Sequence, residues 1–178
     1  MKNIKEKAKD VQLLALDVDG VMTDGRIYFS AQGDELKAFS ILDGQGIKTL
    51  LNNNIQVAII TGRTSPLTAR RARDLGINFI LQGREDKKVA LQELSDELDI
   101  PFKNIAYVGD DLPDLSAIIN AGLGITVPNG HFFVKEHANY CTKVPWNVYF
   151  CGCTDSLRST YYHVLLCERS LPHRFTKQ

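Results

Sequence analysis

The sequence lacks an excess of charge of either sign. Lys plus Arg and Asp plus Glu both number 21 among 178 residues, so the formal net charge is zero. A protein without a positive excess has no general attraction for a polyanion such as DNA. We therefore expect no nucleic acid partner.

Long apolar runs are also missing. No stretch approaches the roughly 20 apolar residues that a membrane-spanning helix needs. Residues 1–10 carry Lys and Glu side chains and contain nothing that resembles a signal peptide. We therefore expect a cytoplasmic chain without a membrane partner.

Cysteine is scarce, and its four residues lie only near the end of the chain, at Cys141, Cys151, Cys153 and Cys167. They lack the C-x-x-C spacing of a structural zinc site, and a reducing cytosol keeps them as inert thiols. The hydrophobic share of 44% and the length suit a single globular domain that buries about 70% of its unfolded surface.

What is present is an alternation of strands and helices. Short segments rich in branched aliphatic residues indicate strands of a parallel sheet covered on both faces. These segments span residues 11–16, 55–60, 78–81, 105–108 and 123–127. Helical patterns occupy residues 46–53, 66–75 and 86–98, the last with Val89, Ala90, Leu94 and Leu98 on its apolar face. The sequence therefore predicts a doubly wound, mainly parallel α/β fold of the Rossmann type.

A β-hairpin is expected within residues 24–40. Residues 26–30 and 35–40 resemble strands, and the turn sequence of residues 31–34 separates them. An isolated two-stranded ribbon is barely stable, so its apolar residues are expected to contact another subunit or, alternatively, to cover their own core. These residues are Ile27, Tyr28, Phe29 and Phe39.

Acidic residues follow two of the predicted strands. Asp17 and Asp19 come after the first strand, and Asp110, Asp111 and Asp114 come after the fourth. Open α/β sheets bind ligands at the carboxyl ends of their strands. D-x-D-G by itself equally suits a turn or a helix cap, but two acidic strand ends together require a cation. Oxygen ligands without His or Cys indicate Mg²⁺.

Two further segments suit phosphate binding. Thr61-Gly62-Arg63 ends the second strand with a hydroxyl, a flexible backbone amide and a guanidinium. Lys87 opens the helix of residues 86–98, where a solvated surface lysine would be equally ordinary. These two segments support a phosphate site only in combination with the acidic strand ends.

In this order, the motifs D-x-D-G-V-x-T-D, T-G-R, a helix-opening lysine and G-D-D-x-x-D resemble the haloacid dehalogenase superfamily of phosphohydrolases. Residues 17–25, 35–39, 43–48 and 106–111 are similar to the 3-deoxy-D-manno-octulosonate 8-phosphate phosphatase family, which serves lipopolysaccharide biosynthesis. The resemblance covers roughly residues 8 to 145. It implies a magnesium-dependent phosphatase whose small hairpin replaces a large cap domain.

The resemblance also implies catalytic roles. Asp17 would attack phosphorus and form an aspartyl phosphate, while Asp19 would protonate the leaving oxygen and later deprotonate the hydrolytic water. Mg²⁺ would be held by the Asp17 carboxylate, the Asp19 carbonyl and Asp110. Thr61 and Lys87 would bind the phosphoryl oxygens.

Residues around the centre receive implied roles as well. Asp111 and Asp114 would orient the metal ligands and waters. The family uses a further set of positions against the sugar acid, here Ser40, Asp43, Gly44, Lys48, Gly62, Arg63 and Arg71. Leu42 departs from the arginine that is usual in the family at that position. The family also forms homotetramers through the hairpin, so a homotetramer is expected.

The resemblance stops near Trp146, which divides the chain into a phosphohydrolase core of residues 1–145 and an atypical tail of residues 146–178. Similar proteins continue with a glycine-rich turn and a helix. One back-translation of residues 151–160, read one base later, gives Ala-Ala-Val-Arg-Ile-Val-Cys-Asp-Leu, which is close to that helix. This match suggests that the tail is out of frame, which reading the gene across the Pro145 codon would test.

Three other functions suit parts of the pattern. The chain is alternatively a phosphatase of a related sugar acid phosphate of the sialic acid type, which hydrolysis of a panel of esters would reveal. A catalytically retired phosphosugar-binding module or a phosphoacceptor switch domain would not need both Asp17 and Asp19.

Overall fold

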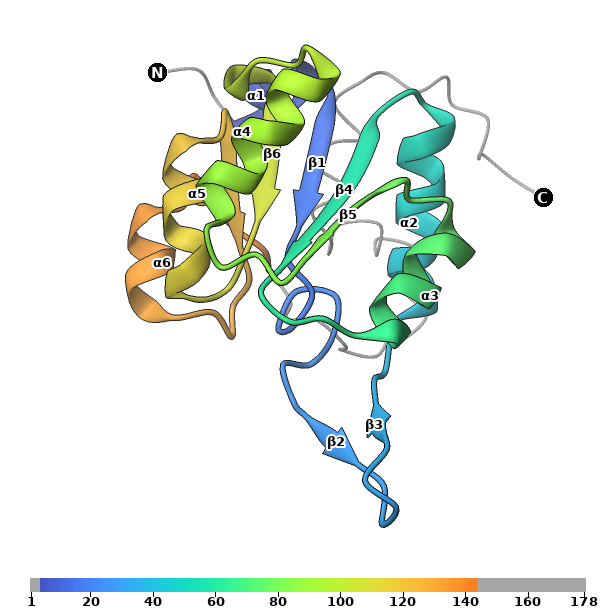
Figure 1. Ribbon diagram of the computed structural model, residues 1–178. Coiled ribbons are helices and arrows are strands. Elements are labelled where there is room, and N and C mark those ends of the chain that lie inside the picture. Colours follow the sequence, from blue (N-terminus) through green and yellow to red (C-terminus); the bar gives the residue numbers. More distant parts are fainter. Residues whose placement is uncertain (1–3, 144–178) are drawn as a thin grey trace, which may run out of the picture.

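The computed structural model describes residues 4–143, which form one parallel sheet between two layers of helices and a projecting hairpin (Figure 1). The sheet contains β1 (Leu13–Leu16), β4 (Gln56–Thr61), β5 (Phe79–Gln82), β6 (Ile105–Val108), β7 (Leu123–Thr126) and β8 (Tyr140–Cys141). The hairpin contains β2 (Tyr28–Phe29) and β3 (Glu35–Leu36). The helices are α1 (Ile4–Lys9), α2 (Ile41–Asn52), α3 (Pro66–Leu75), α4 (Lys87–Leu98), α5 (Leu115–Asn120) and α6 (Phe132–His137).

The order of the strands places a ligand site at the middle of the sheet. The order is β5-β4-β1-β6-β7-β8, and every neighbouring pair is parallel. The chain extends from β1 to β5 on one side and then returns to place β6 on the other side of β1. The winding direction therefore reverses between β1 and β6, where open α/β sheets bind ligands beyond the strand ends. The predicted doubly wound class is confirmed.

Alternation along the buried strands divides the core into two layers. Leu14 and Leu16 of β1 point into the cluster that contains Ala8 of α1, residues of α2 and residues of α3. Leu13 and Ala15 point into the opposite cluster, with residues of α4, α5 and α6. Successive side chains of a strand point to opposite faces, so a strand covered on both sides is apolar throughout.

Several boundaries differ from the sequence-based expectations. α2 begins five residues earlier than predicted, because the Ser40 side chain accepts the Leu42 and Asp43 backbone N–H groups as an N-cap. On α4 the predicted apolar position Val89 is wrong, since it is 52% exposed while Leu91 is buried. α1, α5, α6 and β8 were not predicted, because elements of two to six residues are too short to display a period.

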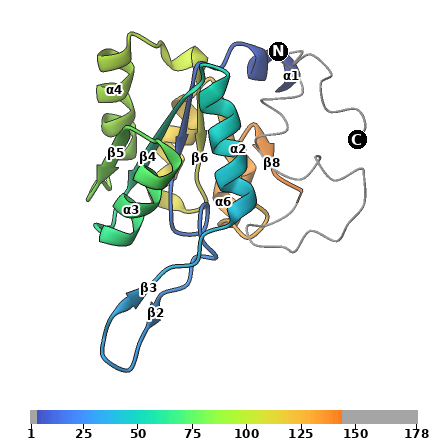
Figure 2. The same cartoon turned by 90° about the vertical axis from the view of Figure 1, so that its right-hand side faces the viewer.

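The hairpin projects away from the carboxyl edge of the sheet (Figures 1 and 2). Its turn places Gly33 at a φ of 89°, a conformation that favours glycine. Ile27 is 54% and Phe29 68% exposed, so the apolar surface expected there is present. Phe39 fits the alternative expectation, because it is half-buried against the core with the Arg71 guanidinium 5.9 Å from its ring centre.

Among residues 4–143, no helix is long and apolar enough to cross a membrane. Cys141 is an exposed free thiol. The other three cysteines and the predicted atypical tail of residues 146–178 lie outside the described residues.

Candidate active site

The first acidic loop begins directly after β1. The Asp17 backbone N–H donates to the Val108 carbonyl at 3.0 Å, which continues the pairing with β6 for one more residue. The chain then turns at Gly20, whose φ is 90°, and the Thr23 hydroxyl accepts the Gly20 N–H at 3.4 Å. Asp17 thus directly continues the strand, and Asp19 belongs to the turn that follows it.

The second acidic loop meets the first at the same edge of the sheet. Carboxylate oxygens of Asp17, Asp110 and Asp114 all lie within 4.8 Å of one another. The two loops are in close contact at Gly20, because a Cβ there would lie 2.0 Å from Asp110 Oδ2. Within the second loop, a Cβ on Gly109 would lie 2.3 Å from the Cβ of Asp114. The predicted convergence of Asp17 and Asp110 is therefore confirmed, and glycine is needed where the two loops approach.

Crowding and burial make this cluster electrostatically unfavourable as it stands. Burial, followed by the charge of Asp114, raises the pKa of Asp17 to about 7 despite the opposing effect of Lys87. Burial and the charges of Asp114, Asp17 and Asp111 raise the pKa of Asp110 to about 7. These three side chains offer only carboxylate oxygens as ligands, and the cluster carries more negative than positive charge. Such a site fits a hard cation such as Mg²⁺.

Lys87 reaches the cluster from the first turn of α4. Its Nζ donates to Asp17 Oδ1 at 2.7 Å and to the Ile60 carbonyl at 2.9 Å, and it lies 3.2 Å from Asp114 Oδ1. Burial would lower the pKa of Lys87, but the Asp114 and Asp17 carboxylates outweigh it and raise that pKa. Lys87 is thus a buried cation within the site rather than a solvated surface lysine.

Asp114 holds the second acidic loop together. Its Oδ1 accepts the Tyr107 hydroxyl at 2.7 Å, and its Oδ2 accepts the backbone N–H groups of Asp110 and Asp111 at 3.1 and 3.2 Å. The exposed Asp111 instead caps the following turn by accepting the Leu112 N–H at 2.7 Å. Tyr107 was not singled out from the sequence, because a tyrosine within an apolar strand reads as an ordinary core residue.

The segment after β4 lies beside these loops. Thr61 is buried, and its hydroxyl accepts the Arg63 N–H at 3.4 Å. Gly62 is half-buried, and a Cβ there would have Glu85 at 3.5 Å, which is ordinary contact. Arg63 is exposed, with Nε 3.8 Å from Asp19 Oδ2 and Nη2 2.8 Å from Glu35 Oε1.

Two residues of the hairpin reach the site without having been predicted there. Lys37 forms a hydrogen-bonded ion pair with Asp19, and its ammonium side chain is only 4% exposed. Glu35 accepts Arg63 at 2.8 Å and the Ser65 hydroxyl at 2.9 Å. The signal that would have identified them is the spacing of two along an extended strand, which directs both side chains to one face.

The predicted sugar-acid residues gather around the first turn of α2. Arg71 Nη2 donates to the Ser40 carbonyl at 2.8 Å, and a Cβ on Gly44 would lie 2.4 Å from that nitrogen. Asp43 is buried, and burial raises its pKa to about 8 against the lowering effect of Arg71. Lys48 is exposed, further along the same helix.

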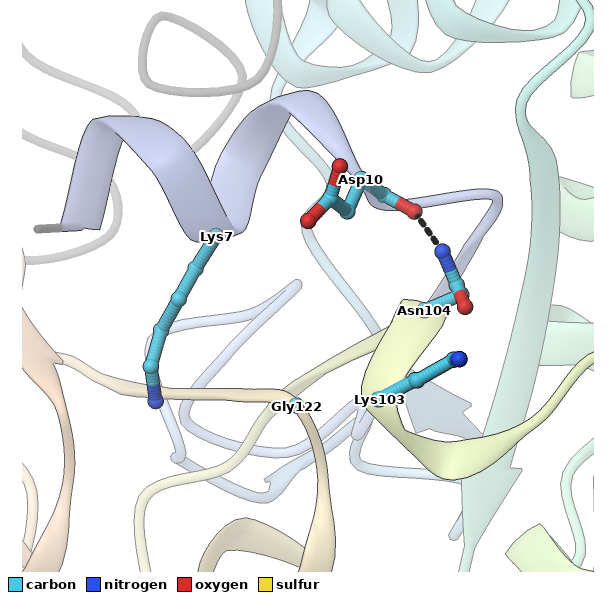
Figure 3. A pocket seen from close by; sticks show the side chains of 5 residues that line it. All are labelled: Lys7, Asp10, Lys103, Asn104 and Gly122. Carbon is cyan, nitrogen blue, oxygen red and sulfur yellow. Dashed lines mark hydrogen bonds between the residues drawn. The ribbon is translucent and has the colours of Figure 1, made fainter. Parts of the chain in front are cut away.

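A second hollow lies at the opposite edge of the sheet. Figure 3 shows its lining residues, which precede the amino ends of strands or belong to α1: Lys7, Asp10, Lys103, Asn104 and Gly122. The Asn104 amide donates to the Asp10 carbonyl across it. The hollow lies at the amino ends of β1, β6 and β7. The length of these strands therefore separates it from the acidic cluster of Asp17, Asp110 and Asp114 at their carboxyl ends.

Comparison with known proteins gives consistent matches. A family of haloacid dehalogenase-like hydrolases matches residues 75–146. The 3-deoxy-D-manno-octulosonate 8-phosphate phosphatase KdsC of Escherichia coli K12 is 44% identical over 138 residues, covering 78% of this chain and 73% of the relative. KdsC of Yersinia pestis is 44% identical over 142 residues, covering 80% and 76%.

Solved structures of similar proteins match as well. A Moraxella catarrhalis 3-deoxy-D-manno-octulosonate 8-phosphate phosphatase in complex with magnesium ion, phosphate ion and KDO has a TM-score of 0.79 at 46% identity, covering 80% of this chain and 82% of that chain. The Yersinia pestis phosphatase has a TM-score of 0.84 at 37% identity, covering 94% and 86%.

Proposed function

The chain belongs to the 3-deoxy-D-manno-octulosonate 8-phosphate phosphatase family of the haloacid dehalogenase superfamily, and on that premise we propose that it hydrolyses this phosphate ester. The products are the free sugar acid and phosphate, in lipopolysaccharide biosynthesis. The observation that carries the proposal is the convergence of Asp17, Asp110 and Asp114 within 4.8 Å at the reversal point of the sheet.

Asp17 is the nucleophile in this proposal. Its carboxylate attacks phosphorus, the bond from phosphorus to the sugar oxygen breaks, and an aspartyl phosphate forms. Covalent catalysis of this kind divides one difficult displacement into two easier ones. Lys87 supports the attack by donating to Asp17 Oδ1 at 2.7 Å, which orients the carboxylate and keeps it ionised.

Asp19 is the acid and base. It donates a proton to the departing sugar oxygen, and it takes a proton from the water that then attacks the phosphorus of the intermediate. That second attack breaks the bond from phosphorus to Asp17 and restores the enzyme. The first transfer leaves Asp19 as a carboxylate, which is the form that can accept a proton from water. One group can therefore perform both transfers.

The residues present suit a magnesium ion. The Asp17 carboxylate, the Asp19 carbonyl and Asp110 would hold it. The Asp114 carboxylate is already occupied by the Tyr107 hydroxyl, two backbone N–H groups and the Lys87 ammonium group. The bound ion supplies positive charge that offsets the repulsion between the nucleophile and the phosphoryl oxygens. Thr61 and Lys87 would bind those oxygens through a hydroxyl and an ammonium group.

Selectivity for the sugar acid is proposed to come from the residues around the hairpin root and the start of α2. A carboxylated sugar phosphate needs cations at both ends, which Arg63, Arg71 and Lys48 supply. Ser40, Asp43, Gly44 and Gly62 complete the proposed set. Leu42 is 56% exposed on the first turn of α2, so this chain lacks one cation that the family usually has there.

We further propose that the enzyme is a cytoplasmic homotetramer assembled through the hairpin. The exposed apolar side chains of Ile27, Phe29 and Leu36 support this assembly, since each is at least half exposed in one chain. A domain without a large cap gains a covered site when neighbouring subunits surround it.

The central test is phosphate release from 3-deoxy-D-manno-octulosonate 8-phosphate in the presence of Mg²⁺, comparing the native chain with Asp17→Asn. Release is expected from the native chain only, because the amide is not a nucleophile. Equal activity in both proteins would refute Asp17 as the nucleophile. A panel of other sugar acid phosphates, including the sialic acid type, would establish the preferred ester.

A further inference from the structure

The segment of the hairpin that starts with β3 directs alternate side chains toward the body of the domain. Glu35, Lys37 and Phe39 are half-buried, whereas Leu36 and Ala38 between them are exposed. A spacing of two in an extended chain directs side chains to the same face. Because Phe39 packs against the core, the other two members of the series also face inward, toward the carboxyl edge of the sheet.

Lys37 is committed to one oxygen of the Asp19 carboxylate. Its Nζ contacts Asp19 Oδ1, and the Lys37 side chain is 4% exposed compared with 27% for Asp19. A lysine so deeply covered loses its hydration, which is costly unless a carboxylate and hydrogen bonds replace it. The pairing is therefore a built-in part of the site rather than a surface ion pair.

The second carboxylate oxygen of Asp19, Oδ2, faces a different cation. Arg63 faces Oδ2, with its Nε 3.8 Å away, beyond hydrogen-bond length. Glu35 holds that guanidinium through Nη2 at 2.8 Å, and Ser65 donates to the other Glu35 oxygen at 2.9 Å. The strand thus engages Oδ1 through Lys37 and restrains Arg63 beside Oδ2.

We propose that Lys37 is a positioning residue for the acid and base step. By binding Oδ1 it fixes the rotation of the Asp19 carboxylate and leaves Oδ2 to carry the proton. That proton goes to the sugar oxygen as its bond to phosphorus breaks and the bond from Asp17 to phosphorus forms. The inference rests on the proposed function, since it requires Asp19 to be the acid.

The leaving group provides a test that a merely structural role would not mimic. A sugar alkoxide needs the proton as it departs, whereas p-nitrophenolate leaves without one. Misplacing the acid therefore harms hydrolysis of the sugar ester much more than hydrolysis of p-nitrophenyl phosphate. The measured quantity is kcat/KM for both esters with Mg²⁺, because it covers the steps through departure of the leaving group.

Lys37→Met is expected to lose about 10–100-fold more in kcat/KM on 3-deoxy-D-manno-octulosonate 8-phosphate than on p-nitrophenyl phosphate, a part of the ~10²–10⁴ that acid catalysis supplies. Lys37→Arg, which still donates to Oδ1, should recover part of the selective loss and provides a second variant if the first does not fold. Lys88→Met removes an exposed lysine of α4 and should leave kcat/KM for both esters unchanged.

Asp19→Asn separates the two claims. If Asp19→Asn shows the selective loss but Lys37→Met loses equally on both esters, Lys37 does not position the acid and the inference is overturned. If Asp19→Asn itself shows no dependence on the leaving group, the acid assignment in the proposed function fails, and the role of Lys37 fails with it. A selective loss in both variants supports the inference.

Discussion

At the level of single residues, the site depends on a few buried charges that compensate one another. Lys87 compensates Asp17 and Asp114 inside the protein, and Tyr107 and two backbone N–H groups saturate Asp114. Replacing one member of such a group leaves the others buried and uncompensated, which costs more than the pair itself contributes. Residue-scale changes here should therefore affect stability and activity together.

Lys87→Met is the direct test of this balance. Its removal leaves two buried carboxylates facing each other, so we expect a loss of about 3–5 kcal/mol in the free energy of unfolding without metal. Phosphate release should fall about 10²–10³-fold, as for other removed oxyanion donors. Urea unfolding and phosphate release measure the two effects, and Lys88→Met is the matched control. An unchanged stability would contradict the role of Lys87 as a buried compensating charge.

Asp43 should make the stability of the protein depend on pH, because burial raises its pKa from 3.8 to about 8. Within the described residues, its Oδ2 and the nearby Arg71 Nε are buried without a hydrogen-bond partner. Between these two pKa values the folded protein holds a proton that the unfolded chain releases. The folded state therefore binds more protons, and its stability falls as the pH rises through this window.

Asp43→Asn removes this titration while keeping the shape of the side chain. The variant should gain stability relative to the native protein as the pH rises from about 5 to about 8, by up to a few kcal/mol. Urea unfolding at both pH values with saturating Mg²⁺ measures the difference. The same difference at both pH values would show that Asp43 does not carry a raised pKa in the folded protein.

At the level of elements, the strand ends form the acidic site, and the hairpin contributes an exposed apolar side and contacts to that site. β1 and β6 stop at Leu16 and Val108, and their loops meet where glycine allows close approach. The hairpin presents an apolar outer side, while Glu35 and Lys37 connect its return strand to the site. The element proposed to hold subunits together is thus also attached to the acid and base group.

Phe29→Asp tests the outer side of the hairpin. Phe29 is 68% exposed, so a charge there should leave the fold of one chain intact. In an apolar contact between subunits the same charge would be desolvated, and the expected tetramer should dissociate. Light scattering after size-exclusion chromatography measures the mass, with Gln32→Glu in the hairpin turn as the control. A tetramer that survives Phe29→Asp would place the contact elsewhere.

At the level of the whole molecule, the fold gathers negative charge from both halves of the chain and leaves it partly uncompensated. Asp17 belongs to the first acidic loop and Asp110 to the second, and burial raises both pKa values to about 7. A cation that binds this arrangement and not the unfolded chain stabilises the whole domain by mass action. Metal binding and folding should therefore be coupled.

Mg²⁺ at about 100 times its dissociation constant should add about 2.7 kcal/mol, or roughly 5–10 °C in Tm. Differential scanning calorimetry with Mg²⁺ and with a chelator measures the shift. Asp110→Asn should lose the response to Mg²⁺, although removal of a like charge raises its stability without metal. A full response in Asp110→Asn would exclude that residue from the metal site.

Most strands of the sheet, and the polar residues that follow them, were predictable from sequence alone. Apolar runs of four to six residues predicted β1, β4, β5, β6 and β7, because a strand buried on both faces has no polar alternative. Asp17, Thr61 and Asp110 were predicted as site residues because they follow such strands, and carboxyl ends of parallel strands share one edge. These inferences needed only local patterns and one rule of topology.

The side chains that face those strand ends from distant parts of the chain became apparent from the folded arrangement alone. Lys37 and Glu35 lie in the hairpin segment that also carries the core-packed Phe39. Tyr107 resembles an ordinary core residue in sequence, and the structure shows its hydroxyl donating to Asp114. Lys87 is equally plausible in sequence as a solvated lysine, and Val89 beside it proved exposed. Ion pairs and burial join residues that are distant along the chain, so no local pattern specifies them.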